Sequence, residues 1–257
     1  MTKRAVVTGA SSGIGEATVR ALRDTGWEVI AVARRADRLE TVGAATGAVP
    51  FAADLTRQTD VDALREFVRA SGGVDALVQV AGGARGSDRV EDGDPEDWTW
   101  MFEANVLASQ RLVASLLPEL RDAARAAGHA SLLFVTSTAA QGAYPGGAGY
   151  NAAKAGEAMI VGALRLELSG EPIRVIEVAP GLVHTEEFAL NRLHGDQAAA
   201  DRIYADVEAP LQASDVADVI AYALNAPGHV NLDLVTIRPV AQAAAHLLAR
   251  GPLQVRD

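Results

Sequence analysis

Residues 4–24, RAVVTGASSGIGEATVRALRD, decide the fold: a short apolar run enters a glycine-rich turn, and the turn opens directly into a helical pattern. Gly9, Gly13 and Gly15 allow a tight turn, a close approach of the backbone to a phosphate, and close packing of the helix on the strand. The start of the helix also offers unpaired N–H groups and a partial positive charge to a pyrophosphate. A turn with a purely structural role is the alternative, but the position after the first strand favours a dinucleotide site.

Six more apolar runs follow the first, and longer segments with apolar residues at helical spacing separate them. Most runs are uninterrupted rather than alternating, as expected where helices cover both faces of a parallel sheet. No glycine- or proline-rich linker and no internal repeat divides the sequence. We predict an α/β fold with a doubly wound, parallel, seven-stranded sheet and helices on both faces (Rossmann-like), in a single domain over residues 1–257. The seven runs are RAVVTG, EVIAVAR, AVPFAAD, DALVQVAG, SLLFVTST, IRVIEVAPG and DLVTIRP.

Residues 182–208 interrupt this alternation with a polar stretch between one strand and the next helix. A connection of this length in a compact domain is usually a lid or a binding loop. A surface insertion without a function is the alternative. We predict that this stretch is the substrate loop.

The composition is that of a globular protein, with 49% hydrophobic and 22% charged residues. The net charge of −10 argues against a nucleic-acid partner, whose binding surface would be basic. The absence of cysteine excludes disulfides, thiolate nucleophiles and cysteine metal sites, and no His, Asp or Glu cluster has metal-ligand spacing. The sequence shows neither a signal peptide nor an apolar stretch of about 20 residues, so we expect a cytoplasmic protein without membrane contact.

A second motif, GAGYNAAKAG at residues 147–156, places Tyr150 and Lys154 four positions apart among small residues. In a helix that interval advances ~6 Å along the axis and returns to nearly the same face. The ammonium group can then lie near the phenol and favour its ionised form. A surface pair without a function is the alternative that these two residues leave open on their own.

The two motifs together resemble the short-chain dehydrogenase/reductase family, and the resemblance covers nearly the whole chain. Ser137 stands thirteen residues before Tyr150, as the family pattern asks, and Asn105 in FEANVLAS matches the family's helix asparagine. Asp54-Leu55 matches the position that contacts adenine. Residues 180–185, PGLVHT, match the segment that meets the nicotinamide.

One element departs from the family pattern. The chain reads QVAG at residues 79–82, where the family usually has NNAG. Ala81 and Gly82 keep the close approach to the cofactor, but the asparagine that steadies the central sheet is missing. We expect Gln79 to be a local structural substitution that does not remove activity.

The resemblance implies hydride transfer to or from a small carbonyl or alcohol substrate, with Tyr150 as general acid and base. A free tyrosine, with a pKa of about 10, is a poor base at neutral pH, so we expect Lys154 and an oxidised nicotinamide to lower the pKa of the phenol. Ser137 donates a hydrogen bond to the substrate oxygen in this scheme, and Lys154 also holds the ribose hydroxyls. Asn105 positions a water that relays the proton.

The end of the second apolar run predicts which cofactor is used. An NAD-specific enzyme places an acidic residue there, whereas this chain has Ala33 followed by Arg34 and Arg35. Guanidinium groups suit a 2′-phosphate, so we predict NADP, with Arg34 as the main contact and Arg35 in support. A solvated basic helix start is the alternative. The predicted cofactor-binding residues are Gly9, Ser11, Ser12, Gly13, Ile14, Gly15, Arg34, Arg35, Asp54, Leu55, Ala81, Gly82, Tyr150, Lys154, Pro180, Gly181, Val183 and Thr185.

The C-terminal stretch HVNLDLVTIRPVAQ resembles a branch of the family that acts on 3-hydroxy acids and serine-like substrates, with related aldehyde reductases. His184, Arg192 and His194 in the substrate loop are candidate contacts for an acidic substrate, or else solvated lid residues. His129 is interpreted as a polar residue in a helix-to-strand loop.

The expected assembly is a homodimer or homotetramer. The family resemblance implies it, and the apolar arc of residues 152–164 is too wide for a one-sided surface helix. Two other functions on this fold stay open. A non-catalytic NADP-binding sensor or regulator predicts erosion of the Ser–Tyr–Lys set, and an epimerase or dehydratase usually carries a longer C-terminal substrate domain.

Overall fold

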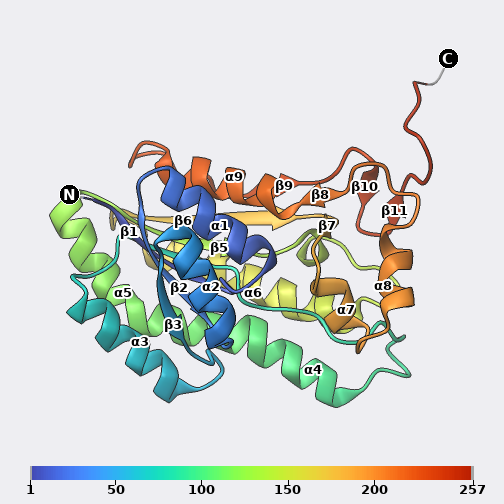
Figure 1. Ribbon diagram of the computed structural model, residues 1–257, viewed down its shortest axis with the longest axis horizontal. Coiled ribbons are helices and arrows are strands. Elements are labelled where there is room, and N and C mark those ends of the chain that lie inside the picture. Colours follow the sequence, from blue (N-terminus) through green and yellow to red (C-terminus); the bar gives the residue numbers. More distant parts are fainter. Residues whose placement is uncertain (1, 256–257) are drawn as a thin grey trace.

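The computed structural model describes residues 2–255 (Figure 1). Within them, seven strands form one sheet in the order β3-β2-β1-β4-β5-β6-β9, and every neighbouring pair is parallel. One strand lies at each of the seven predicted apolar runs, so the predicted sheet is confirmed. The strands are β1 (Arg4–Thr8), β2 (Glu28–Ala33), β3 (Val49–Ala52), β4 (Ala76–Gln79), β5 (Ala130–Val135), β6 (Ile173–Pro180) and β9 (Val235–Ile237).

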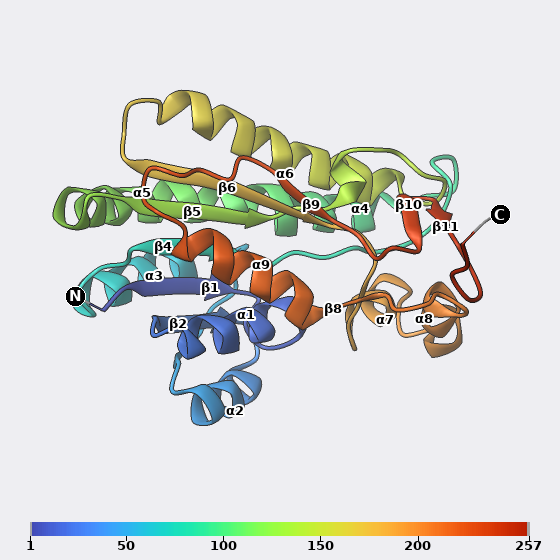
Figure 2. The same ribbon diagram turned by 90° about the horizontal axis from the view of Figure 1, so that it is seen from above.

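Helices cover both faces of the sheet, and Figure 2 separates the two layers. The strand order reverses between β1 and β4, where the crevice at the carboxyl ends of the strands is the usual ligand site in such sheets. The helices on one face are α1 (Gly13–Asp24), α2 (Ala36–Thr46) and α9 (Ala213–Asn225), and those on the other are α3 (Gln58–Ala70), α5 (Ala108–Ala127) and α6 (Ala148–Glu167).

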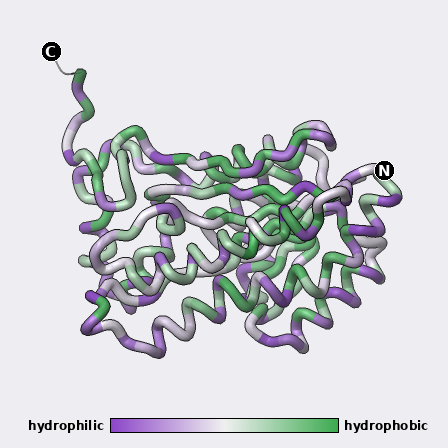
Figure 3. The backbone as a smooth tube through the Cα atoms, turned by 180° about the vertical axis from the view of Figure 1, so that it is seen from behind, coloured by the Kyte–Doolittle hydropathy of each residue, from purple (hydrophilic) through white to green (hydrophobic). Residues whose placement is uncertain are grey.

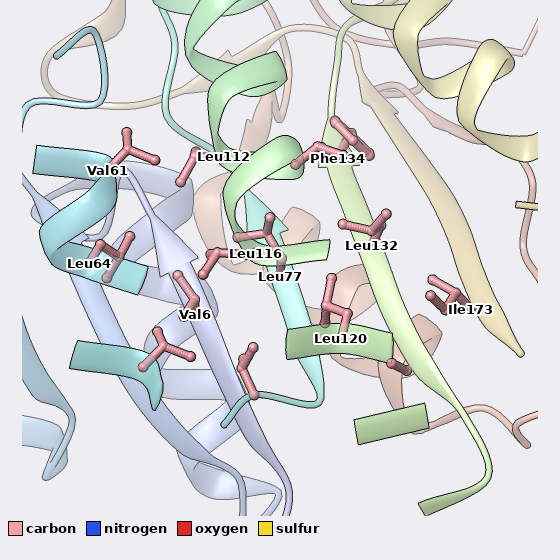
Figure 4. Packing of buried hydrophobic residues seen from close by; sticks show 14 of the residues in the cluster. Val6, Val61, Leu64, Leu77, Leu112, Leu116, Leu120, Leu132, Phe134 and Ile173 are labelled. Carbon is pink, nitrogen blue, oxygen red and sulfur yellow. The ribbon is translucent and has the colours of Figure 1, made fainter. Parts of the chain in front are cut away.

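Successive side chains of one strand enter two different cores. Leu132 and Phe134 of β5 pack with Leu116 of α5 on one face (Figure 4). Leu133 and Val135, each one residue further along, pack on the face covered by α9. Burial on both faces explains why the strands read as uninterrupted apolar runs. The helices instead alternate between hydrophilic and hydrophobic residues (Figure 3), because only one side of each faces the sheet.

Two irregular turns shape the substrate side of the crevice. α4 (Pro95–Phe102) continues through a π-helical turn (Glu103–Leu107) into α5, and a short 3-10 turn (Thr138–Ala140) follows β5. π-Helical turns inside α-helices are frequent at functional sites. Both turns lie where predicted catalytic residues occur.

The predicted substrate loop is more regular than its sequence suggests. Residues 182–208 contain β7 (Val183–His184), α7 (Phe188–Arg192) and α8 (Gln197–Tyr204), and β7 pairs with β8 (Leu211–Gln212). In Figures 1 and 2, α7 and α8 lie beyond the carboxyl ends of the strands. We call residues 182–208 the lid.

The C-terminal segment packs against the lid. It forms a hairpin of β10 (Gln242–Ala244) and β11 (Leu247–Leu248). The Gly251 N–H then donates to the Asp206 carbonyl at 2.7 Å. Gln242 accepts from the Leu182 N–H at 2.8 Å, where the lid begins.

The substituted position after β4 is buried. Gln79 is 2% exposed, and within residues 2–255 neither end of its amide has a hydrogen-bond partner. Thr8 ties the ends of β1 and β4 together instead, because its hydroxyl accepts from the N–H groups of Val80 and Ala81 at 3.0 Å each. Gln79 is therefore a buried position outside the cavity lining, and the expectation that this substitution does not remove activity stays a prediction.

Candidate active site

A cavity of ≈ 810 Å³ opens at the carboxyl ends of the parallel strands. The glycine-rich turn after β1, the ends of the central strands and the lid enclose it. Every predicted cofactor-binding residue lines this cavity, and so does Ser137. Asn105, the remaining predicted catalytic residue, lies behind the cavity wall and is fully buried.

The glycine-rich turn has no room for side chains at two of its glycines. Gly9 has a φ of +64°, in the left-handed region, and a Cβ there would come within 3.0 Å of the Ala81 nitrogen. A Cβ on Gly15 would collide with the Gly9 carbonyl, so α1 packs directly on the turn. The cavity therefore meets bare backbone at the start of α1, which is suited to a phosphate.

α6 brings Tyr150 and Lys154 together at the cavity wall, and both are buried, at 8% and 4% exposure. The Lys154 ammonium donates to the Val135 carbonyl at 3.1 Å and pairs with Glu157 at 2.6 Å. Glu157 is fully buried and accepts from the Ser109 hydroxyl at 3.1 Å. The predicted pair therefore continues, through Glu157, into the interior between α6 and α5.

Burial controls the ionisation of the phenol. Desolvation raises the pKa of Tyr150, and the positive charge of Lys154 opposes this shift without cancelling it. Lys154 alone therefore does not lower the pKa of the phenol below its ordinary value, and the lowering expected from Lys154 together with an oxidised nicotinamide stays a prediction. Burial also acts to lower the pKa of Lys154, but the charges of Glu157 and Tyr150 outweigh it and raise that pKa, so the ammonium stays protonated.

Ser137 and Asn105 form different hydrogen bonds. The Ser137 oxygen accepts from the Ala139 N–H at 3.0 Å, and its hydroxyl also hydrogen-bonds with the Tyr150 phenol, where it acts to lower the pKa of the phenol against the larger effect of burial. The Asn105 amide donates to the carbonyls of Gly83 and Met101 at 3.0 and 2.7 Å, and its oxygen accepts from the Gly83 N–H at 3.1 Å. Asn105 thus anchors the segment after β4, and its predicted water remains a prediction.

The two arginines after β2 differ in orientation. Arg35 donates to Ser11 at 3.0 Å and to Ser12 at 3.2 Å, and it holds Glu187 of the lid through both terminal nitrogens at 2.7 and 2.8 Å. Arg34 lines the cavity near Asp54. Burial acts to raise the pKa of the Asp54 carboxyl, but hydrogen bonds from Thr56, and then the charge of Arg34, outweigh it and lower that pKa. Arg35 is therefore the arginine whose contacts reach the glycine-rich turn.

The lid places an aromatic ring and a cation beside the phenol. The ring centroid of Phe188 lies 5.7 Å from that of Tyr150, and the Arg192 guanidinium lies 5.8 Å from the Tyr150 ring. Arg192 donates to the Tyr144 hydroxyl at 3.1 Å and to the Gly146 carbonyl at 2.9 Å. These partners are neutral and leave the positive charge of Arg192 facing the cavity.

The three histidines named in the sequence analysis occupy different environments. His194 lines the cavity and contacts Asp97 at 3.1 Å. His184 packs against the Tyr204 ring at 4.5 Å between centroids. His129 precedes β5, at the end of the strand opposite to the cavity, as its interpretation as a loop residue requires. Within residues 2–255, no group of three His, Asp or Glu side chains could hold a metal ion, and no helix is long and apolar enough to span a bilayer.

The structure adds three residues that the sequence analysis did not single out: Glu157, Glu187 and Tyr144. Glu157 had a detectable signal, because it is the lone acid in an otherwise small and apolar helical segment. Glu187 had none, because the pair Glu186-Glu187 reads as ordinary surface charge.

Comparisons with known proteins identify the family of this chain. The family model for short chain dehydrogenase matches residues 3–194. An uncharacterized oxidoreductase of Mycobacterium tuberculosis is 48% identical over 250 residues, which are 97% of this chain and 96% of that protein. Sulfoacetaldehyde reductase 2 of Chromohalobacter salexigens is 36% identical over 246 residues, which are 93% and 94% of the two chains.

A solved structure, the closed form of serine dehydrogenase complexed with NADP+, superposes with a TM-score of 0.89. It is 29% identical and covers 97% of this chain and 100% of its own. The matched family model spans the glycine-rich turn, the Ser–Tyr–Lys set and all of α7. The chain belongs to the short-chain dehydrogenase family of oxidoreductases.

Proposed function

We propose that this protein is an NADP(H)-dependent dehydrogenase/reductase that interconverts a carbonyl and an alcohol on a small anionic substrate, with Tyr150 as the general acid and base. The observation that carries the proposal is the convergence of Tyr150, Ser137 and Lys154 on one cavity wall beside the glycine-rich turn. The NADP complex of the serine dehydrogenase, which superposes over nearly the whole chain, supports the choice of cofactor.

The residues present fit this cofactor. The turn at Gly9 and Gly15 leaves backbone exposed for a pyrophosphate. Arg35 and Ser12 already donate to an anion, the Glu187 carboxylate, and Ser11 accepts from Arg35. When bound, NADP(H) supplies or accepts the hydride. The Asp54-Leu55 position and residues 180–185 complete the predicted binding surface.

The protein's own residues handle the proton. Burial keeps the Tyr150 phenol protonated at neutral pH, so it can give its proton to the oxygen of a carbonyl substrate. Ser137, beside the phenol, donates a hydrogen bond to the same oxygen. Lys154 stays charged beside the phenol and stabilises the phenolate that proton transfer leaves.

The anionic substrate class follows from the charge of the lid. Arg192 lines the cavity beside Tyr150, and its hydrogen bonds described above go to neutral groups. The sulfonate or carboxylate of a substrate can therefore form an ion pair with its guanidinium. A guanidinium binds such groups through two parallel N–H donors. The sulfoacetaldehyde reductase and serine dehydrogenase among the similar proteins, each named for a substrate that bears an anionic group, support this class.

The test compares matched aldehydes. NADPH absorbance is followed with sulfoacetaldehyde and with propanal, and we expect the anionic aldehyde to react with the larger kcat/KM. Arg192→Ala should lower kcat/KM for sulfoacetaldehyde roughly 10- to 100-fold, the loss of a hydrogen bond to a charged group, and leave propanal nearly unchanged. Tight NADPH binding with no turnover of any aldehyde or alcohol would favour the non-catalytic sensor instead.

We also propose a homo-oligomer. Met159 and Leu166 lie seven residues apart on α6, hence on one side of the helix, and are 73% and 81% exposed. Exposed apolar side chains gathered on one face often mark an interface. Light scattering should give two or four times the mass of one chain, and a monomer at micromolar concentration would contradict the assignment.

A further inference from the structure

Glu187 reaches across the cavity from the lid to the glycine-rich turn. It directly precedes α7, and its carboxylate accepts from the two terminal nitrogens of Arg35 at 2.7 and 2.8 Å. Ser12 donates to the same carboxylate at 3.0 Å. Three N–H and O–H donors therefore hold this anion at the start of α1.

The same donors are the ones that a 2′-phosphate requires. Arg35 also donates to Ser11 at 3.0 Å, so its guanidinium is fixed against the turn rather than extended into water. A guanidinium fork that already binds a carboxylate through both terminal nitrogens cannot bind a phosphate with the same nitrogens. Occupancy of this position by Glu187 and by a phosphate is thus mutually exclusive.

We propose that Glu187 occupies the subsite of the cofactor's 2′-phosphate and competes with it, so that this lid carboxylate limits the protein's preference for NADP(H) over NAD(H). The inference rests on the proposed cofactor site. NADP(H) displaces Glu187 from Arg35, whereas NAD(H), which has an uncharged hydroxyl at this position, leaves the ion pair in place.

The expected size of the competition follows from exposure. The side chains of Arg35 and Glu187 are 42% and 25% exposed, so water and salt screen their attraction. Replacing the Glu187 carboxylate by an uncharged amide removes the group that competes for Arg35. It also removes a negative charge that would repel the 2′-phosphate. Glu187→Gln should therefore tighten NADP+ binding by roughly three- to tenfold.

The experiment titrates NADP+ and NAD+ by calorimetry against the wild type, Glu187→Gln and Glu186→Gln. Glu186 is the adjacent acid, is exposed and does not line the cavity, so it is a matched control for charge. We expect tighter NADP+ binding in Glu187→Gln alone, with NAD+ affinity within about twofold of the wild type in all three proteins.

A double-mutant cycle tests whether Glu187 changes NADP+ affinity through the Arg35 guanidinium. In an Arg35→Ala background the Glu187→Gln substitution should change NADP+ affinity by less than about twofold, because the carboxylate has lost the guanidinium that holds it at the subsite. Circular dichroism of each variant without nucleotide checks that the fold is retained.

Three outcomes would overturn the proposal: weaker NADP+ binding in Glu187→Gln, equal tightening of NADP+ and NAD+, or an unchanged NADP+ affinity. The first would mean that Glu187 closes over the bound nucleotide. Each leaves the proposed function intact as long as the wild type binds NADP+. A wild type that binds neither nucleotide would contradict both.

Discussion

Two ion pairs each place a cation at the wall of the same cavity, have nearly the same N–O distance, and differ chiefly in their access to water. Lys154 and Glu157 are 2.6 Å apart, with side chains 5% and 1% exposed, whereas Arg35 and Glu187 are 2.7 Å apart, with side chains 42% and 25% exposed. Removing one partner from the buried pair leaves the other charge unpaired in a medium of low dielectric, which is costly. In the exposed pair, water can solvate the charge that remains. Under the proposed function, the buried pair would hold the proton-transfer site in place, and the exposed pair would open when the cofactor's 2′-phosphate binds.

The largest effect is expected at the phenol beside the buried pair. Tyr150→Phe keeps the ring that packs against Phe188 but removes the proton donor. Turnover should fall by about 10²- to 10⁴-fold with NADP+ affinity and circular dichroism preserved. Tyr222→Phe, at a 72% exposed position on α9, is the control and should behave as the wild type. Near-normal turnover of Tyr150→Phe would contradict the mechanism.

Breaking the buried pair should cost more stability than any change to the exposed pair. Glu157→Ala leaves the Lys154 charge buried, and we expect a loss of about 3–5 kcal/mol in the free energy of unfolding, measured in urea. Glu167→Ala, at the exposed end of the same helix, should stay within about 0.5 kcal/mol of the wild type. Replacing both partners, as Lys154→Met with Glu157→Leu, should restore most of the stability without activity. A loss below about 1 kcal/mol in Glu157→Ala would show that the pair behaves as a surface pair.

The rates of carbonyl reduction and alcohol oxidation should depend differently on pH. Because burial raises the pKa of Tyr150, the protonated phenol that reduction needs is present at neutral pH and is lost only as the pH rises through that pKa. Alcohol oxidation needs the phenolate, so its rate should increase with pH by up to about tenfold per unit below that pKa. Steady-state rates in both directions from pH 6 to 10 test this. An oxidation rate that is already flat at pH 7 would show that the phenol is ionised there.

A smaller effect is expected at the arginines. Arg34→Ala and Arg35→Ala should each weaken NADPH binding by roughly 10- to 100-fold, the cost of a lost charged hydrogen bond, while NADH binding changes little. Sequence reasoning favours Arg34, whereas the contacts of Arg35 with Ser11 and Ser12 lead us to expect the larger loss for Arg35. Added salt should reduce the preference of the wild type. Equal losses of both nucleotides would contradict the arginine assignment.

The smallest effect is expected for the stability of the exposed pair. The hydrogen bond from Arg35 lowers the pKa of Glu187 below its ordinary value, so the pair contributes stability above that ordinary value and loses it as the pH falls through the lowered pKa. Glu187→Gln should reduce the free energy of unfolding by less than about 1 kcal/mol at pH 7. The difference from the wild type should vanish in strong acid. If Glu187→Gln lowered the free energy of unfolding as much as Glu157→Ala, the exposed pair would contribute as much stability as the buried pair, contrary to this expectation.

Sequence alone predicted the sheet and the composition of the cavity because both depend on short-range patterns. β6 is buried along its whole length, and such a strand must read as an apolar run. The glycine turn and the Tyr150–Lys154 interval likewise lie within a few residues of sequence. Their positions on strand ends and on a helix follow from those patterns.

The rest depends on packing between distant segments. Arg35 and Glu187 are separated by 152 residues, and no local pattern joins them. The raised pKa of Tyr150 depends on how completely α6 is covered, which charge spacing does not reveal. The helices of the lid span only five and eight residues, which is too short for periodicity to separate them from a loop.

Hydrogen bonds hold α7 at both of its ends. Glu187 precedes it and bonds to the turn that faces the cofactor, while Arg192 ends it and bonds to the Gly86 and Gly146 carbonyls on the substrate side. α7 spans five residues and joins these two contacts directly, so under the proposal a ligand that displaces Glu187 also acts on the position of Arg192. Linkage makes such coupling reciprocal: the factor by which NADP(H) alters substrate affinity equals the factor by which substrate alters NADP(H) affinity. Under the proposed displacement of Glu187, the lid would therefore couple the affinity for NADP(H) to the affinity for the substrate.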